Sequence, residues 1–337
     1  MNEPDLASRA LGGTVVWAND EFFAGAENLV TPGPAVHDTS EYGPRGKIYD
    51  GWETRRRRDD GAADEAIVRL GVPGIVRQIV VDTAHFAGNY PPFASVEGAC
   101  LLGYPSADEV RAAPWTPLVA KSPLAGDTAN VLAVDGADRL VTHVRLTIYP
   151  DGGVARLRVH GEIVPDPRRL GGRVDLASTV HGGRIAACSD MFYASPANVL
   201  APGLAAATSD GWETARRRDD GNDWLVVALA APGVLHDAVI DTSQFVGNAP
   251  GWAALTDADT GAKLLPRTPL LPDTEHRFRL RHAAPAANVR LDIYPDGGLA
   301  RLRLNGTIAP EATDAIARRW LALLPADADI ASGEFFD

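Results

Sequence analysis

A short polar block near the start of the chain carries residue types suited to acid–base chemistry on a small anion. It contains Asp50, Trp52, Glu53, Arg55 and Arg56. Two nearby carboxylates can supply a general acid or base, and a pair of guanidinium groups can bind a carboxylate in a two-pronged manner. A charged loop in which Trp52 and Glu53 merely anchor a turn accounts for the same residues equally well.

A second polar block follows a predicted strand and contains Asp82, His85 and Asn89. Loops at the rim of a β-sandwich commonly bind ligands. His85 can exchange protons near neutral pH, and Asp82 can orient it. The alternative for His85 is a packing or surface group with no chemical role. Glu97 is a reserve candidate for a base or a metal ligand.

Metal and cofactor chemistry has little support in the motifs. The eight histidines show neither His-x-His nor His-Glu-x-x-His spacing, and there is no glycine-rich phosphate loop or Gly-x-Ser-x-Gly sequence. Two cysteines exclude a disulfide framework and a four-thiolate metal site. We therefore expect that no cofactor is required, and that a divalent metal is possible but unsupported by ligand spacing.

Composition is that of an ordinary globular protein of 337 residues, with 45% hydrophobic and 23% charged residues. The formal net charge of −12 argues against nucleic acid or an anionic membrane as the main partner. No apolar stretch approaches the roughly 20 residues of a membrane span, and the N-terminus lacks a signal-peptide pattern. The expected location is the cytoplasm.

The chain repeats itself, with four blocks in the same order in both halves. These blocks begin at residues 20, 50, 82 and 148 and recur at 190, 210, 241 and 293. Residues 50–61 recur as 210–221 with a single change, Arg55 to Ala215. We interpret this as a duplication with longer loops in the first half, giving domains 1–168 and 169–337 joined near a Pro- and Gly-rich linker at 165–172.

Each half is predicted to be all-β. Residues 142–149 alternate apolar and polar side chains, residues 150–153 form a Pro-Asp-Gly-Gly turn, and residues 154–159 alternate again, which predicts a hairpin with one buried face. Many short strands with Gly/Pro turns are typical of a sandwich or jelly roll. One helix is predicted at 311–324, where Ala312, Ile316 and Trp320 share a stripe before Pro325.

Taken together, the paired Asp-Gly-Trp-Glu-Thr blocks, residues 81–89 and the two Ile-Tyr-Pro-Asp-Gly-Gly blocks resemble the allantoicase family, or allantoate amidinohydrolases. The likeness covers nearly the whole chain. It implies two tandem jelly-roll domains similar to galactose-binding modules, and association into a homo-oligomer. The implied reaction is hydrolysis of allantoate to ureidoglycolate and urea, a step in the degradation of purines and of allantoin. Such an enzyme is a hydrolase acting on C–N bonds of linear amidines.

The implied reaction sets requirements for the site. Because urea leaves intact, the bond that breaks is the C–N bond at the central carbon of allantoate, which needs an acid, a base and a cation for the carboxylate. The hypothesis assigns Arg55 and Arg56 to the carboxylate, proton exchange to Glu53 and His85, orientation of His85 to Asp82, and a ureido hydrogen bond to Asn89. It also places Asp50 and Trp52 among the substrate-binding residues. Gln244 replaces His85 in the second repeat, so the sequence does not decide whether that repeat has an active site of its own.

Two rival functions fit part of the pattern. One is a β-sandwich module that binds carbohydrate or another small ligand without catalysis, for which exposed Trp or Tyr platforms are expected. The other is a hydrolase of a related ureide. Trp52 and Trp212 stand beside Glu and Arg residues within the repeated block, which favours a small charged substrate.

Overall fold

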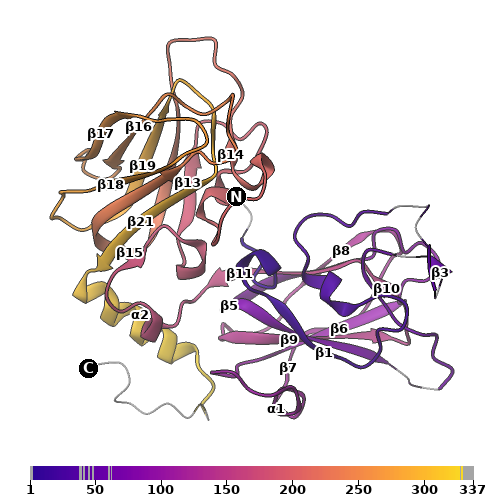
Figure 1. Cartoon of the computed structure of the whole chain (residues 1–337). Coiled ribbons are helices and arrows are strands. Elements are labelled where there is room, and N and C mark those ends of the chain that lie inside the picture. The colour runs from indigo at the N-terminus through magenta and orange to yellow at the C-terminus, as the bar shows by residue number, and fades with distance from the viewer. Residues whose placement is uncertain are drawn as a thin grey trace. The chain divides into compact units, whose positions relative to one another are not determined.

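The computed structural model describes residues 3–37, 40, 42–44, 46–47, 49–59, 61, 63–326 and 328. The chain divides into two compact units, made mainly of Asn2–Val164 and of Pro165–Ala322. In Figure 1 the first unit runs from indigo to magenta and the second from magenta to yellow. In the described part of the chain, no helix is both long and apolar enough to cross a membrane.

The first unit is built on an antiparallel sheet with strand order β1-β5-β9-β6-β7, to which β8 and β11 are joined through β5. The strands are β1 (Thr14–Ala18), β5 (Asp64–Asp82), β6 (Phe93–Ala99), β7 (Thr116–Pro123), β8 (Ala129–Ala133), β9 (Val141–Tyr149) and β11 (Arg156–Ile163).

The long strand β5 links the two sets of strands in this unit. Its first part, residues 64–69, pairs with β9, whereas residues 74–82 pair with β11. The register breaks between Arg69 and Gly74, where the sequence contains Pro73. Proline lacks a backbone N–H and glycine weakens a strand, so this is where a continuous ladder is hardest to maintain.

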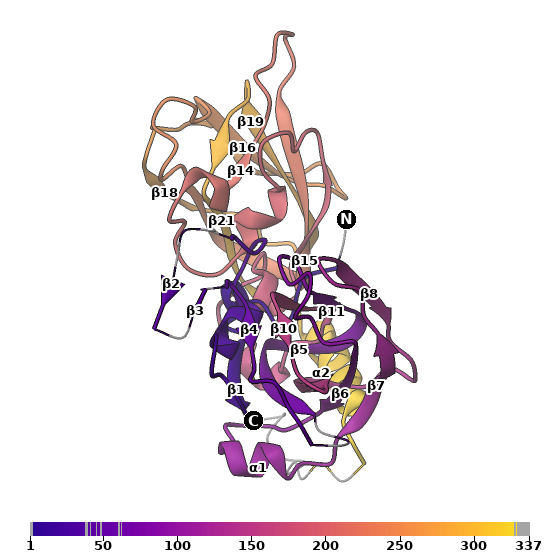
Figure 2. The ribbon, with the colours of Figure 1, turned by 90° about the vertical axis from the view of Figure 1, so that its right-hand side faces the viewer.

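Smaller elements complete the first unit. A two-stranded sheet joins β4 (Trp52–Glu53) to β10 (Gly153–Val154), and Figure 2 shows these two elements side by side. A second small sheet joins β2 (Tyr42–Gly43) to β3 (Gly46–Lys47). The short helix α1 (Ala107–Arg111), which the sequence analysis did not predict, is started by a capping box between Ser106 and Glu109.

The second unit repeats this plan. Its strands are β12 (Val174–Asp175), β13 (Arg184–Cys188), β14 (Trp212–Glu213), β15 (Asp223–Asp241), β16 (Trp252–Asp257), β17 (Lys263–Pro269), β18 (Glu275–Arg279), β19 (Ala286–Tyr294), β20 (Gly298–Leu299) and β21 (Arg301–Ile308). The strand β15 pairs with β19 through its first part and with β21 through its last part. Leu225 and Ile240, from these two parts, belong to one buried core cluster.

The predicted all-β tandem fold is confirmed, as is the C-terminal helix. This helix, α2 (Pro310–Leu323), begins one residue before the predicted start at 311. Ala312 and Ile316 pack against the core of the second unit, and Trp320 is fully buried. The apolar stripe read from the sequence is therefore the face that the helix buries.

Candidate active site

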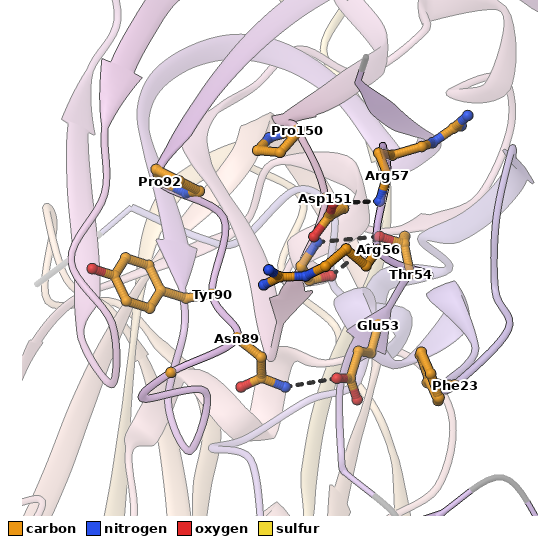
Figure 3. Close-up of a pocket in the computed structure, with 12 residues that line it drawn as sticks. Phe23, Glu53, Thr54, Arg56, Arg57, Asn89, Tyr90, Pro92, Pro150 and Asp151 are labelled. Carbon is orange, nitrogen blue, oxygen red and sulfur yellow. Dashed lines mark hydrogen bonds between the residues drawn. The ribbon is translucent and has the colours of Figure 1, made fainter. Parts of the chain in front are cut away.

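A cavity of about 490 Å³ opens on the first unit beside β4 and β10 (Figure 3). Its lining comes from four segments that are far apart in the sequence. They contribute Phe23, Glu53, Thr54, Arg56, Arg57, Gly88, Asn89, Tyr90, Pro92, Pro150, Asp151 and Gly152. A concave surface of this size with a few converging polar groups fits a small-molecule site.

Glu53 lies at the cavity on β4, where its backbone pairs with Gly153. The Asn89 amide donates a hydrogen bond from Nδ2 to Glu53 Oε1 at 2.6 Å. Burial raises the pKa of Glu53 above its ordinary value, and the hydrogen bond from Asn89 opposes this shift only in part. Burial thus shifts the pKa of Glu53 in the direction that suits a general acid.

The three consecutive arginines 55–57 have different partners. Arg55 forms an ion pair with Asp20 at 2.6 Å, and Arg57 forms one with the buried Asp64 at 2.6 Å. Arg56 makes neither a hydrogen bond nor an ion pair with any residue that the structure describes, and it lines the cavity. In Figure 3 its side chain points across the opening between Tyr90 and Asp151. The guanidinium of Arg56 is thus available to bind an anion in the cavity.

The positions of two carboxylates explain this division. Successive side chains of a strand point to opposite sides, but β4 ends at Glu53, and beyond it the positions of Asp20 and Asp64 decide which arginines are paired. Within β4, this alternation separates Trp52 from Glu53. Trp52 is 0% exposed and donates its indole N–H to the Asp20 carbonyl oxygen at 2.7 Å. It anchors the segment in the core and has no surface for a substrate.

The bend before β10 brings Asp151 to the cavity. Asp151 is buried, and its Oδ2 accepts a hydrogen bond from the Arg57 backbone N–H at 2.6 Å. The bend needs Gly152, which has φ +142° and where a Cβ would come within 2.7 Å of the Asn89 carbonyl oxygen. Because this bend holds both the Arg57 backbone and the Asn89 loop, it fixes the two sides of the cavity relative to each other.

His85 lies in a different environment from the one that the sequence predicted. Its Nε2 donates to the Ala35 carbonyl oxygen at 3.2 Å, and its backbone N–H donates to Asp127 Oδ1 at 2.7 Å. Gln244 occupies the same place in the second unit, with a similar positive φ and a contact from Nε2 to the Ala205 carbonyl oxygen. Gln244 thus reproduces the contacts of His85, and His85 does not line the cavity.

Three other predicted carboxylates also lie outside the cavity lining. Asp82 Oδ1 accepts the backbone N–H of Ala84 at 2.9 Å, and no described contact joins it to the His85 ring. Asp50 pairs with the buried Arg156 at 2.6 Å. Glu97 lies on β6 and pairs with Arg145, whose Nε donates to it at 2.8 Å. These carboxylates neutralise or hold neighbouring groups of the fold.

Three of the nine predicted residues thus meet at the cavity, namely Glu53, Arg56 and Asn89. The sequence analysis missed Asp151, Tyr90 and Phe23. A signal for Asp151 was present, because the Tyr-Pro-Asp-Gly-Gly block occurs in both repeats, but it was interpreted only as a turn. Within the described ranges, no group of three or more His, Cys, Asp or Glu side chains is arranged to hold a metal ion.

Comparison with known proteins decides the family. The model of the allantoicase repeat matches residues 4–164 and 174–309. The chain belongs to the allantoicase family. This confirms the resemblance noted in the sequence.

Relatives named as probable allantoicases support the family assignment. One from Nocardia farcinica is 54% identical over 90% of this chain and 94% of its own length, and one from Pseudomonas aeruginosa is 42% identical over 90% and 95%. A solved allantoicase structure from Saccharomyces cerevisiae matches with a TM-score of 0.77 and 33% identity, covering 90% of this chain and 93% of that one. The similarity extends over both repeats.

Proposed function

We propose that the cavity of the first repeat is the active site at which this member of the allantoicase family hydrolyses allantoate to ureidoglycolate and urea, a step of purine degradation. One observation carries the proposal. A carboxyl group with a raised pKa, Glu53, shares a cavity with Asn89 and with the unpaired guanidinium of Arg56. Allantoate needs all three, because it presents one carboxylate and two ureido groups on a single carbon.

Binding is assigned by charge and by hydrogen-bond capacity. Arg56 holds the substrate carboxylate, since a guanidinium makes two parallel hydrogen bonds to such a group. Asn89 keeps one N–H and its carbonyl oxygen for a ureido group while its other N–H binds Glu53. Asp151 can accept a ureido N–H, and the rings of Tyr90 and Phe23 form walls of the cavity.

The chemical step uses Glu53 twice. The protonated carboxyl donates its proton to the nitrogen of the departing urea, and the pair of electrons in the C–N bond leaves with that nitrogen. The lone pair of the retained ureido nitrogen forms a C=N bond to the central carbon. Water then adds to this carbon, and the Glu53 carboxylate takes the proton that the water loses. The enzyme is returned to its starting state, and one water molecule has been consumed for each urea released.

The carbohydrate-binding alternative loses two of its candidate platforms. Trp52 and Trp212 are both fully buried, so neither can stack on a sugar ring, whereas Trp252 is exposed. The product analysis below decides between this alternative and hydrolysis. The proposal also includes finer expectations, namely activity without an added cofactor, a cytoplasmic location and a homo-oligomeric assembly. Light scattering coupled to size exclusion and an activity assay after chelation test the assembly and the metal dependence.

The test is product analysis with purified protein. We expect allantoate to give equal amounts of urea and ureidoglycolate without initial release of ammonia, because water attacks the central carbon and not a ureido carbonyl. Allantoin and ureidoglycolate are assayed in parallel as substrates of the rival hydrolase. No urea from allantoate, with or without added divalent metal, contradicts the proposal, and turnover of a related ureide alone replaces it.

A further inference from the structure

The second repeat reproduces the frame of the first-repeat cavity contact by contact. Glu213 pairs with Gly298 as Glu53 pairs with Gly153. The Asn248 amide donates from Nδ2 to Glu213 Oε1 at 2.7 Å, close to the 2.6 Å of the corresponding bond in the first repeat. The same backbone bonds therefore present the same carboxylate–amide pair on a second surface.

The second repeat also has an arginine, Arg216, that corresponds to Arg56 and has no partner among the described residues. Arg217 donates its backbone N–H to Asp296 Oδ2 at 2.8 Å and pairs through its guanidinium with Asp223, as Arg57 does with Asp151 and Asp64 in the first repeat. Arg216 precedes it, is exposed, and has neither a hydrogen bond nor an ion pair among the described residues. Because no hydrogen bond or ion pair with a described residue employs this guanidinium, it is available to an outside anion.

The residues around the Glu213–Asn248 pair differ from those around Glu53 and Asn89, and the difference affects catalysis more than ligand binding. Tyr90 and Pro92 of the first repeat are replaced by Ala249 and Gly251. Asn248 is exposed, whereas Asn89 is half-buried. A site without these walls leaves its hydrogen bonds in contact with water, which weakens electrostatic assistance to a reaction.

We propose that the second repeat carries a further binding site for small ureido acids, formed by Glu213, Arg216 and Asn248, which holds its ligand without hydrolysing it. The ligand class rests on the function proposed for the first repeat. Arg216 binds the carboxylate, and the Glu213–Asn248 pair binds the ureido group, since a carboxylate accepts and an amide both donates and accepts. Affinity is roughly tenfold lower than at the first site because the aromatic wall is missing.

The test uses N-carbamoylglycine, a ureido acid with one ureido group. It lacks the second nitrogen whose lone pair would expel urea, so it binds without turnover. Calorimetric titration of the full-length protein is expected to show that two molecules of N-carbamoylglycine bind to each chain. In Arg216→Ala or Asn248→Ala, only the tighter binding event, at the first repeat, is expected to remain. Arg218→Ala is the matched control, because Arg218 is exposed and unpaired in the described structure. It should keep both equivalents.

The outcomes separate this inference from the proposed function. One equivalent in the wild-type protein, or two equivalents retained in Arg216→Ala, overturns the second site. Allantoate turnover by Arg56→Ala is measured in parallel against Arg58→Ala. Full turnover by Arg56→Ala overturns the active-site proposal instead, and the titration of Arg216→Ala still reports on the second site. Circular dichroism confirms that each variant is folded.

Discussion

Replacing Glu53 with Gln removes its proton chemistry and keeps its shape. The side-chain oxygen of Gln can still accept the hydrogen bond that Asn89 makes to Glu53 at 2.6 Å, so the cavity is expected to keep its geometry. General acid–base catalysis by a positioned side chain contributes about 10²- to 10⁴-fold. We therefore expect kcat for allantoate to fall by about 10²- to 10⁴-fold, with a much smaller change in KM. Urea release measured with urease over time gives both constants.

Glu53→Gln should lower activity but should not lower the stability of the folded protein. Burial raises the pKa of Glu53 in the folded state, so the folded state holds its proton more tightly than the unfolded chain does, and stability falls as pH rises through this range. Glu53→Gln has no charge to bury, so at neutral pH its free energy of unfolding should equal or exceed that of the wild type. Urea denaturation at pH 7 measures this.

The matched control is Glu97→Gln, which removes a carboxyl group that lies on β6 and pairs with Arg145. We expect kcat of this variant to stay within a factor of two of the wild type. The reasoning is refuted if Glu53→Gln retains more than about a tenth of wild-type kcat. It is also refuted if Glu97→Gln loses as much activity as Glu53→Gln.

Further predictions concern substitutions at the cavity and in the core of the first unit. Arg56→Ala should lower kcat/KM by roughly 10- to 150-fold, the loss expected for hydrogen bonds to a charged group, while Arg58→Ala should leave it unchanged in the same urea assay. Tyr90→Ala should raise KM about five- to tenfold through loss of an aromatic wall, measured by initial rates. Trp52→Phe should lower the free energy of unfolding by about 2–3 kcal/mol, because it leaves the Asp20 carbonyl oxygen without its donor; chemical denaturation checks this. Burial lowers the pKa of His143 to about 4, so stability should fall by roughly 3 kcal/mol as pH drops from 6.5 to 4, and His143→Gln should flatten that part of the stability profile.

The sequence predicted the fold well because its signals are local and occur twice. Alternation of side chains in residues 142–149 and the apolar stripe at 311–324 each depend on neighbouring residues. The predicted hairpin of residues 142–159 was wrong, because β9 pairs with β5 and β6 whereas β11 pairs with β5. The duplication then required both halves to share one architecture. The short helix at 107–111 was missed because a single turn carries too few apolar positions to show a period.

The site was predicted only in part because its geometry depends on pairing between distant segments. The sequence predicted that Arg55 and Arg56 bind the substrate carboxylate, but only the positions of Asp20 and Asp64 show that Arg56 is the arginine left unpaired at the cavity. The role of His85 depended likewise on the Ala35 carbonyl oxygen, 50 residues away. Glu53 and Asn89 were both predicted, and their contact with each other became visible only in the folded chain.

The most direct test of the central claim is a crystal structure of Glu53→Gln with allantoate bound. We expect the substrate carboxylate within hydrogen-bond distance of the Arg56 guanidinium, and one ureido group against Asn89 and the introduced glutamine, inside the first-repeat cavity. Allantoate bound instead beside His85 and His37, or on the sheet face at Glu97 and Arg145, would contradict the account.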